Sequence, residues 1–575
     1  MMMRWVLGIS AVFLFVSCVL PAQAGTQAGA NRARKEALSK TGFLLAAPDR
    51  GFTGNDRVRQ AFKSISAMPE QYPSRLVFIT DQDSAKYVDQ ALARLTAEGV
   101  KKLVVLPLFL SRANPRFALL KTFVNAAQPA MAVQYARAFG DSYLAVEMLA
   151  ARLKRVNGAD LVIIAGNGAK DGKSRKQMSQ DLTRIAHQAR QGVFMGKIKT
   201  IVWPVRGAQG YEDINHESWQ HVRESKGRVQ LVPFHMGREL DSMMSFNAAL
   251  KAQLPDGMTL LPTGEDERDW ISLWMQREVN RYTALERGSV GIVVNAHGAD
   301  FHWNQTMRDA SRDLALKYPV EYAFSMGDPP SLRTAVNRLE AKGVGAIVIV
   351  RVFGMASSFR RSTEHLTGQD AETPLASMAR PSHGSMHGHM GMAYVPRLRT
   401  ASMVVTTGGL QDDPLFASAL LDRAWAISKN PAKETVILVG HGKGDDQANE
   451  AWLDVLASIS AQMKRNGGDQ FRDILYQTWR EDWKDKRSNR IASVQDMVRA
   501  AAKDGGIALV IPARTTGRGP VDRFLKGLDY RAGTGFAPHK LFSQWLEQQV
   551  SKGVAILRQS RHPIMVKHKA LHDDS

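Results

Sequence analysis

An internal repeat sets the architecture of this chain. Ala91–Phe109 reads ALARLTAEGVKKLVVLPLF, and Ala335–Phe353 reads AVNRLEAKGVGAIVIVRVF. Both stretches follow A-x-x-R-L-x-A-x-G-V, continue with a β-branched run and end on Phe. The pattern predicts an amphipathic helix, a glycine turn and a buried strand. Agreement at so many positions indicates one structural unit that is used repeatedly.

A second element occurs four times. Each copy is an apolar strand, a tight polar turn and the start of a helical pattern: GFLLAAPDRGF (Gly42–Phe52), DLVIIAGNGAKDG (Asp160–Gly172), VGIVVNAHGAD (Val290–Asp300) and TVILVGHGKGDD (Thr435–Asp446). Near-continuous apolar strands that alternate with helices predict parallel sheets covered on both faces, a three-layer αβα arrangement. We expect an α/β protein of four repeated modules, paired into two lobes. Ligands should bind beyond the carboxyl ends of the strands.

The chain has 575 residues, too many for one hydrophobic core. The repeats predict modules at 40–150, 158–255, 288–370 and 432–550, with a His/Met-rich loop at 371–400 and a basic tail at 551–575. Apart from the N-terminus, no segment of the sequence is long enough to cross a membrane.

The first residues predict an export signal over 1–24. They combine a positive start, an apolar run and a small-x-small cleavage site at Ala22–Ala24. We expect a periplasmic protein, with an uncleaved membrane anchor as the alternative. Cys18 is the only cysteine, and Phe15 makes FVSC a poor lipobox, which disfavours a lipoprotein. The mature chain would then hold no disulfide, thiolate metal site or iron–sulfur cluster.

The turns after the four first strands are the expected place for chemistry. Aligning them places Asp49, Asn167, His297 and His441 at one equivalent position. A glycine follows each histidine and lets the backbone pass close to a ligand. A turn histidine often only caps and hydrogen-bonds its own loop. Its presence in two modules favours a functional role instead.

The last two modules resemble a known family. VILVGHGKGDDQANEAWLD resembles the opening motif of the class II chelatases of the sirohydrochlorin (CbiX/SirB) type, and VVNAHGADFHWNQ is a second version of it. PVEYAFSMGDPPSL resembles the second strand and helix of that family. QDDPLFASALLDRA and GTGFAPHKLFSQWL resemble its longer multi-module members. The resemblance covers Gly288 to about Val550 and is weaker over Lys40–Leu250.

The resemblance implies a lyase that inserts a divalent metal into an acidic tetrapyrrole such as sirohydrochlorin, as in cobalamin biosynthesis. Cobalt, iron or nickel would be the substrate metal, and neither ATP nor another nucleotide would be needed. His441 and His297 would bind the metal and accept the pyrrole N–H protons, which suits imidazole chemistry. The first two modules would be degenerate. The alternative is a non-enzymatic periplasmic protein that binds metal or tetrapyrrole in the same cleft.

The chain departs from the family pattern at one point. Members usually carry a second histidine in a Gly-x-His context after a later strand, and no module has it. Glu239 is the nearest substitute, as a proton acceptor or metal ligand. His235 and His365 lie nearby but outside the motif position, and His539 is expected to start a helix.

One further segment, PSHGSMHGHMGMAY (Pro381–Tyr394), is rich in metal-binding side chains. His383, His387 and His389, with three methionines, suit Cu, Ni, Co or Zn. The alternative is a solvated linker. The net charge of +21 favours acidic partners, here the polycarboxylate tetrapyrrole. The basic residues are dispersed without interleaved aromatics, so we expect no nucleic-acid partner.

Overall fold

The computed structural model of the protein describes residues 41–68, 71–191, 193–194, 196–205, 207–238, 245–262, 267–286, 288–324, 326–369 and 395–560. Within these ranges the strands form four sheets of four strands, one for each predicted module, although the fourth strand lies beyond the predicted end of module 2 at residue 255 and of module 3 at residue 370. None of the helices described there combines the length and apolar character needed to cross a membrane. The export signal, the His/Met segment and most of the basic tail lie outside the described residues.

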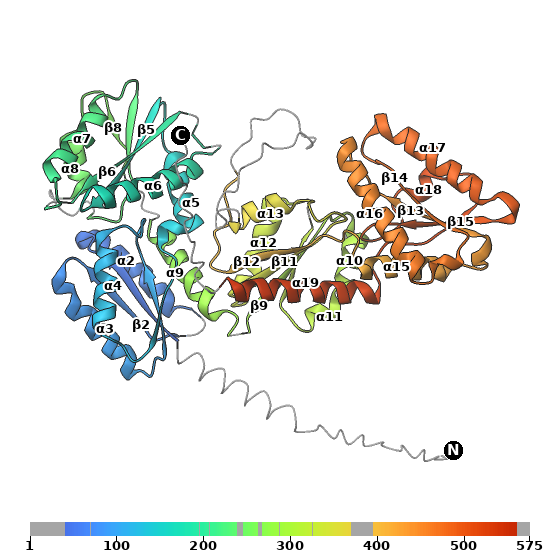
Figure 1. Cartoon of the computed structure of the whole chain (residues 1–575), viewed down its shortest axis with the longest axis horizontal. Helices are drawn as coiled ribbons and strands as arrows, with labels where there is room; N and C mark the ends of the chain where they lie inside the picture. The colour runs from blue at the N-terminus through green and yellow to red at the C-terminus, as the bar shows by residue number, and fades with distance from the viewer. Residues whose placement is uncertain are drawn as a thin grey trace, which may run out of the picture.

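The first two modules occupy the N-terminal half (Figure 1). Module 1 contains β1 (Thr41–Pro48), α2 (Gly51–Ser66), β2 (Ser74–Ile79), α3 (Ala85–Ala97), β3 (Lys102–Pro107), α4 (Pro115–Ala126), β4 (Ala132–Tyr135) and α5 (Tyr143–Leu153). Module 2 contains β5 (Leu161–Ala169), α6 (Gly172–Ala189), β6 (Lys197–Pro204), α7 (Tyr211–Arg223), β7 (Val229–Pro233), α8 (Phe246–Ala252), β8 (Thr259–Leu260) and α9 (Glu267–Thr283).

The other two modules follow along the chain. Module 3 contains β9 (Val290–Ala296), α10 (Phe301–Ala310), α11 (Arg312–Ala315), β10 (Val320–Phe324), α12 (Pro329–Ala341), β11 (Ala346–Val352), α13 (Arg360–Leu366), β12 (Met403–Gly408) and α15 (Pro414–Ile427). Module 4 contains β13 (Glu434–Gly440), α16 (Asp446–Arg465), β14 (Asp473–Thr478), α17 (Lys484–Ala501), β15 (Ile507–Pro512), α18 (Val521–Phe524), β16 (Tyr530–Ala532) and α19 (Lys540–Gln559).

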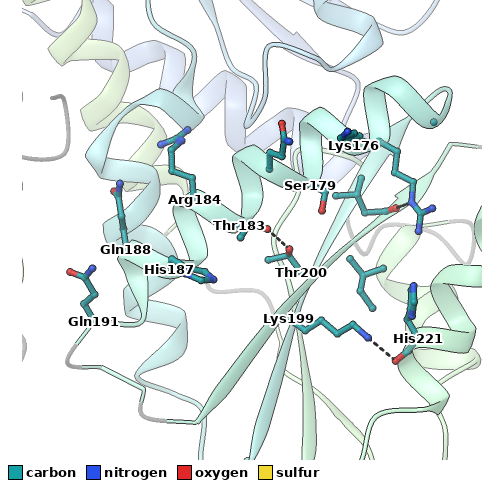
Figure 2. Close-up of a pocket in the computed structure, with 15 residues that line it drawn as sticks. Lys176, Ser179, Thr183, Arg184, His187, Gln188, Gln191, Lys199, Thr200 and His221 are labelled. Carbon is teal, nitrogen blue, oxygen red and sulfur yellow. Dashed lines mark hydrogen bonds between the residues drawn. The ribbon is translucent and has the colours of Figure 1, made fainter. Parts of the chain in front are cut away.

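All four sheets have the same topology. The first strand of each module lies between the second and third, and the fourth strand pairs with the third, as in the order β2-β1-β3-β4. Every pair is parallel. In module 2 the edge strand β6 lies beside helix α6 (Figure 2). The predicted four-module α/β fold is confirmed, and the carboxyl ends of the strands in each module meet at one edge of its sheet.

The repeated unit has the structure that its pattern predicts. Ala91–Phe109 includes most of α3, a turn at Gly99 and strand β3. Ala335–Phe353 includes the end of α12, a turn at Gly343 and strand β11. Both glycines have a left-handed backbone, with φ of +80° and +77°. Glycine adopts this conformation without the strain that a side chain would cause.

The predicted end of module 3 at residue 370 is wrong. Strand β12 pairs with β11 in the sheet of module 3, with Ile347 opposite Val404. The 371–400 segment is therefore an insertion within module 3, before its fourth strand, and does not separate modules 3 and 4. The six-residue strand follows a long insertion, so its link to the earlier strands could not be seen from periodicity.

Exchanged helices join the modules in pairs. The last helix of module 1, α5, packs on α6 of module 2, and α9 of module 2 packs on α2 of module 1. In the same way α15 packs on α16 of module 4, and α19 returns to β11 and β12 of module 3. One apolar core therefore spans modules 1 and 2, and another spans modules 3 and 4. The two predicted lobes are these two shared cores.

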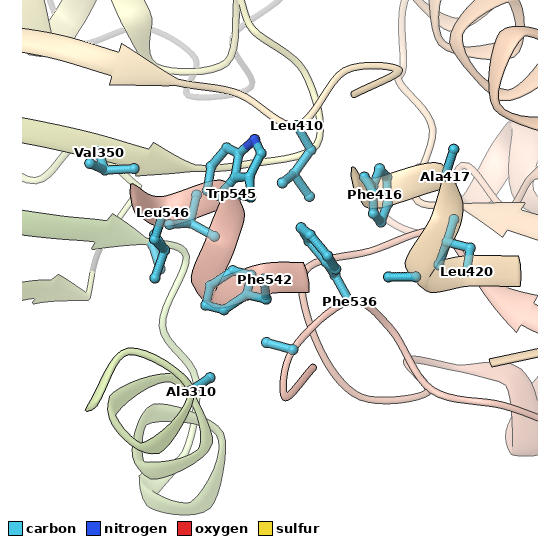
Figure 3. Packing of buried hydrophobic residues seen from close by; sticks show 14 of the residues in the cluster. Ala310, Val350, Leu410, Phe416, Ala417, Leu420, Phe536, Phe542, Trp545 and Leu546 are labelled. Atoms are coloured by element: carbon cyan, nitrogen blue, oxygen red, sulfur yellow. The ribbon is translucent and has the colours of Figure 1, made fainter. Parts of the chain in front are cut away.

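Helix α19 shows how the second lobe is built (Figure 3). Phe542, Trp545 and Leu546 lie between module 3, represented by Val350, and the module 4 side, where Phe416 of α15 packs on Phe536. Trp545 is fully buried. Burial of such large apolar side chains is the main stabilising contribution to this lobe.

Residues 395–402 hold the two lobes together. Arg397 forms a buried ion pair of 3.0 Å with Glu147 of α5. The Tyr143 hydroxyl donates to the Leu398 carbonyl at 2.8 Å, and the Asn280 amide donates to the Ala401 carbonyl at 2.9 Å. Leu398 also donates its N–H to the Leu366 carbonyl at 2.7 Å. The residues on either side of the His/Met segment are thus held close together at the lobe junction.

Candidate active site

His441 lies at the carboxyl end of the central strand of module 4. Strand β13 is buried along its whole length and ends at Gly440. Helix α16 begins at Asp446, and the Asp445 side chain caps it by accepting the Ala448 N–H at 2.8 Å. The turn from His441 to Asp445 therefore lies at the edge where ligands bind in parallel α/β sheets.

The sequence G-H-G-K-G leaves room for the groups around His441. A Cβ at Gly440 would lie 2.9 Å from the indole nitrogen of Trp452. A Cβ at Gly442 would lie 2.9 Å from the Arg480 backbone nitrogen, and Gly442 also has φ of +85°. A Cβ at Gly444 would lie 2.2 Å from the Trp483 indole. Each glycine is needed because a larger residue would displace one of these neighbours.

Arg480 fastens the His441 turn to the end of strand β14. Its Nε donates to the Lys443 carbonyl at 2.7 Å, its Nη2 donates to the Gly444 carbonyl, and its Nη1 lies 2.6 Å from the Asp446 carboxylate. Arg480 is buried and has φ of +52°, a strained value for a residue with a side chain. This arrangement turns the next two residues, Glu481 and Asp482, toward His441.

Two carboxylates and two indoles surround the imidazole. The Nε2 atom of His441 lies 3.2 Å from Oε1 of Glu481 and 3.0 Å from Oδ2 of Asp482. The ring stacks over Trp452 at 6.1 Å and meets the edge of Trp483 at 5.9 Å. Glu481 is nearly buried at 14% exposure, whereas Asp482 is 62% exposed. The site thus has one inner carboxylate and one that reaches solvent.

The other ring nitrogen fixes the tautomer. Nδ1 lies 3.0 Å from the Gly442 carbonyl, which only accepts hydrogen bonds, so Nδ1 carries the hydrogen. Nε2 is then the atom that exchanges a proton or binds a cation. Among the described residues no group of three or more His, Cys, Asp and Glu side chains forms a ready metal site. The distances of 3.0 and 3.2 Å from Nε2 to the two carboxylates are short enough for proton transfer.

His297 occupies the same position in module 3. Its Nδ1 lies 2.6 Å from the Gly298 carbonyl, as in His441. Gly298 has φ of +75°, and a Cβ there would lie 2.8 Å from Phe324 at the end of β10. His297 is exposed, and no ion pair to it occurs in the described part of module 3. The backbone geometry is repeated, but the carboxylates are not.

The two histidines do not touch, although their turns border one interface. A Cβ at Gly354, just beyond β11, would lie 2.9 Å from the ring of Trp452. Trp452 stacks on His441, and β11 is the neighbour of β9, whose end carries His297. The strand ends of modules 3 and 4 therefore face each other around Trp452.

The predicted equivalence of Asp49 is wrong by one residue. Pro107 and Arg351 hold the same place in the repeated unit, and they pair with Ala46 and Asn295 respectively. Ala46 is therefore equivalent to Asn295. The residue two positions after Ala46 is Pro48, and the residue two positions after Asn295 is His297, so Pro48 and not Asp49 is the equivalent of His297. A hydrogen bond that recurs in three turns agrees with this. The backbone N–H two residues after the equivalent position donates to an asparagine side chain at 2.8–3.1 Å: Arg50 to Asn55, Ala299 to Asn304 and Lys443 to Asn449.

Asp49 has a structural role instead. Its carboxylate accepts from Asn55 at 2.7 Å and pairs with Arg238 of module 2 at 3.0 Å. These hydrogen bonds with Asn55 and Arg238 lower the pKa of Asp49 against the opposing effect of burial, which is the largest single influence. The carboxylate joins the two modules and is not free for chemistry.

The turn of module 2 is closed. The register of β5 with β7 confirms that Asn167 is equivalent to His441. A cavity of only about 30 Å³ remains between Asn167, His235 and Asn114 of module 1. The Gly237 N–H donates to Nδ1 of His235 at 3.0 Å, and Nε2 lies 2.8 Å from Oδ1 of Asn247. Burial lowers the pKa of His235 to about 4, so this ring is a neutral core residue.

One segment of the chain, in the first module, matches a family model. Residues 50–156, from the turn after β1 to just beyond α5, match the CbiX family model. This segment is similar to the CbiX chelatases. The match falls in the module whose sequence motifs resemble that family less clearly than those of modules 3 and 4. Because all four sheets share one strand order, the four modules are copies of the fold that the CbiX-like segment adopts.

Comparison with solved structures gives a more distant similarity. Among solved structures, a multi-domain protein from Deinococcus radiodurans matches at 17% identity and a TM-score of 0.29; it is described as structurally similar to chelatases, with two additional novel domains. The match covers 46% of this chain and 56% of that chain, so it spans about half of each protein. No curated protein matches the chain.

The remaining predicted residues lie away from the His441 turn or outside the described residues. His539 caps α19 by accepting the Leu541 N–H at 3.2 Å, which confirms that it starts a helix. The Nε2 atom of His365 lies 3.1 Å from the Val395 carbonyl, at the lobe junction. Glu239 and the three histidines of the His/Met segment, His383, His387 and His389, lie outside the described residues.

Sequence reasoning missed four neighbours of His441: Glu481, Asp482, Trp452 and Trp483. For all of these except Trp452 a signal was present, because WREDW directly follows the second strand of module 4. In a parallel sheet the ends of neighbouring strands meet, so polar residues after the second strand lie beside the first-strand turn. After the second strand of module 3 the sequence is SMGDPP, which holds no glutamate, and its Asp328 caps α12 by accepting the Ser331 N–H at 3.0 Å.

Proposed function

We propose that this protein inserts a divalent metal, cobalt or iron and alternatively nickel, into an acidic tetrapyrrole such as sirohydrochlorin. The observation that carries the proposal is the His441 site, where Nε2 lies between two carboxylates above an indole. The CbiX match in module 1 and the shared fold of all four modules support the reaction class.

Insertion replaces two pyrrole N–H protons by one divalent cation, so the site must receive a cation and release two protons. His441 accepts a proton at Nε2, a role that is typically worth about 10²–10⁴ in rate. Glu481 stabilises the charged ring, and the exposed Asp482 passes the proton to solvent. The same three groups attract the incoming metal before the macrocycle takes it.

The substrate would bind over Trp452 and Trp483, since flat macrocycles pack on aromatic faces. Lys443 belongs to the His441 turn, and burial lowers the pKa of its side chain. Its ammonium group would pair with a substrate carboxylate. His297 would act from the facing module, where the exposed Phe301 at the start of α10 offers a further aromatic ring. Modules 1 and 2 would be structural, because the turn of module 2 is closed and Asp49 is paired.

Two further roles belong to the same proposal. The His/Met segment would collect metal through His383, His387 and His389 and pass it to the second lobe. The mature protein would begin at Gly25 and act in the periplasm. Mass spectrometry of the N-terminal peptide tests export, since an intact Met1 in a cytosolic fraction would contradict it.

The experiment that tests the function is cobalt insertion into sirohydrochlorin by the wild type and by His441→Ala. Loss of insertion with retained tetrapyrrole binding supports the enzyme. A wild-type rate equal to the rate in buffer, with bound tetrapyrrole, would support the non-enzymatic binding protein instead.

A further inference from the structure

A cationic groove lies on module 2, outside the lobe that contains His441. Helix α6, edge strand β6 and helix α7 form its walls, and its volume is about 860 Å³ (Figure 2). Small-molecule sites commonly have volumes of about 300–1,000 Å³. The described residues that line it include four cations, Arg175, Lys176, Arg184 and Lys199, and no carboxylate.

Few of these charges are neutralised. Arg175 pairs with Glu217 at 2.6 Å. Arg184 has a long ion pair of 3.9 Å to Asp141 and also interacts electrostatically with Asp181, and its Nη2 donates to the Gly140 carbonyl at 2.9 Å. Lys199 has one long contact of 3.5 Å to the His221 carbonyl. Lys176 extends from the exposed side of α6 (Figure 2). The groove therefore has excess positive charge, and the field favours an anion.

The neutral lining groups also suit an anion. The hydroxyls of Thr183 and Thr200 lie 2.5 Å apart across the junction of α6 and β6, so one of them can turn its hydrogen outward. The Gln180 and Gln188 amides supply N–H donors. Carboxylates and phosphates form their strongest hydrogen bonds with such donors and with Lys and Arg.

The free edge of β6 is poorly suited to pairing with an additional strand. A strand that pairs there would need the outward backbone groups of β6, and Arg175 Nε already donates to the Val202 carbonyl at 3.3 Å. Charged side chains on an edge strand commonly block such pairing. The groove thus suits a small molecule better than an extended peptide.

The spacing of the cations sets the shape of that molecule. Lys176 and Arg184 are eight residues apart on α6, a rise of about 12 Å along the helix. A single compact anion would not reach both. We propose that this groove binds an elongated small molecule with several anionic groups, carboxylates or phosphates, at a site separate from the His441 turn.

The test uses the full chain at low salt and two probes, inorganic tripolyphosphate and butane-1,2,3,4-tetracarboxylate, with binding measured by calorimetry. The variant Lys176→Gln/Lys199→Gln removes two lining charges. The control Lys173→Gln/Lys197→Gln removes two exposed lysines of the same helix and strand that do not line the groove. Both variants lose the same net charge.

We expect at least one probe to bind the wild type, and its Kd to rise at least about tenfold in the groove variant and less than about twofold in the control. Comparison of the two probes shows whether phosphate or carboxylate is preferred. Absence of binding by both probes would overturn the proposal, and so would equal weakening in the two variants, which would indicate only a general charge effect.

Discussion

His441 differs from the other residues at first-strand ends in the groups around its ring. Pro48 has no titratable group, Asn167 is enclosed, and His297 is exposed without a described ion pair. Only at His441 do two carboxylates approach Nε2. A base of this kind depends on neighbours that orient it and stabilise its charge. The proposed chemistry of module 4 would therefore rest on residues from two strand ends, β13 and β14.

The carboxylates can be tested without removing the imidazole. Glu481→Gln/Asp482→Asn keeps the shape of the site and removes its negative charge. We expect cobalt insertion to slow by about 10–100-fold, the usual effect of losing an orienting partner. Glu450→Gln, an exposed neighbour on α16, is the control and should keep the wild-type rate. Equal rates for all three proteins would show that the carboxylates have no part in the reaction.

His235 gives the first lobe a dependence on pH. Burial lowers its pKa from 6.5 to about 4. As the pH falls below 6.5, His235 becomes protonated in the unfolded chain, whereas in the folded chain it stays neutral down to about pH 4. The free energy of unfolding of the first lobe therefore decreases as the pH falls from 6.5 to 4, by about 3 kcal/mol in total.

Thermal unfolding of the wild type and of His235→Gln between pH 7.5 and 4.5 measures this effect. The variant should be less stable at pH 7.5, because it disturbs the bond to Asn247, but its melting temperature should fall less steeply with acid. The same slope in both proteins would mean that His235 does not titrate on unfolding.

At the scale of elements, the central strands and the helix-turn-strand repeat were predictable because apolar runs and glycine turns are local signals. Strand β12 was not, since its partner β11 precedes the His/Met insertion. The Asp49 error has a similar cause: a turn residue can be aligned only when the register of the neighbouring strand is known, and register depends on tertiary pairing. Glu481 and Asp482 follow strand β14 in the sequence, but their approach to His441 depends on the pairing of β14 with β13.

The exchanged helices predict how each lobe responds to damage. Trp545 of α19 and Trp274 of α9 are both fully buried, one in each shared core. Replacing either by Ala should destabilise its own lobe by about 3–5 kcal/mol, the usual cost for a large buried ring.

Each variant serves as the control for the other. In calorimetry, Trp545→Ala should lower the transition of the second lobe, and Trp274→Ala that of the first. If each substitution lowered both transitions equally, the lobes would unfold as one unit and the division into two shared cores would be energetically meaningless.

In the whole molecule, the described residues that flank the His/Met segment on both sides lie at the lobe junction. Deleting Pro381–Tyr394 should hardly change the melting temperature, because Leu366, Leu398 and the Arg397–Glu147 pair keep the flanking residues in place. Bound copper, nickel or cobalt per chain should fall. A lower melting temperature with unchanged metal content would mean that the segment contributes to folding and not to metal binding.

The most direct test of the account is the rate of cobalt insertion into sirohydrochlorin by the wild type, His441→Ala, His297→Ala and the double variant, with His302→Ala as an exposed-histidine control from the same module as His297. We predict a wild-type rate above buffer, a loss of at least about a hundredfold in His441→Ala, a smaller loss in His297→Ala and full activity in the control. Tetrapyrrole binding should persist in every variant. A wild-type rate equal to buffer, or full activity in the double variant, would contradict the account.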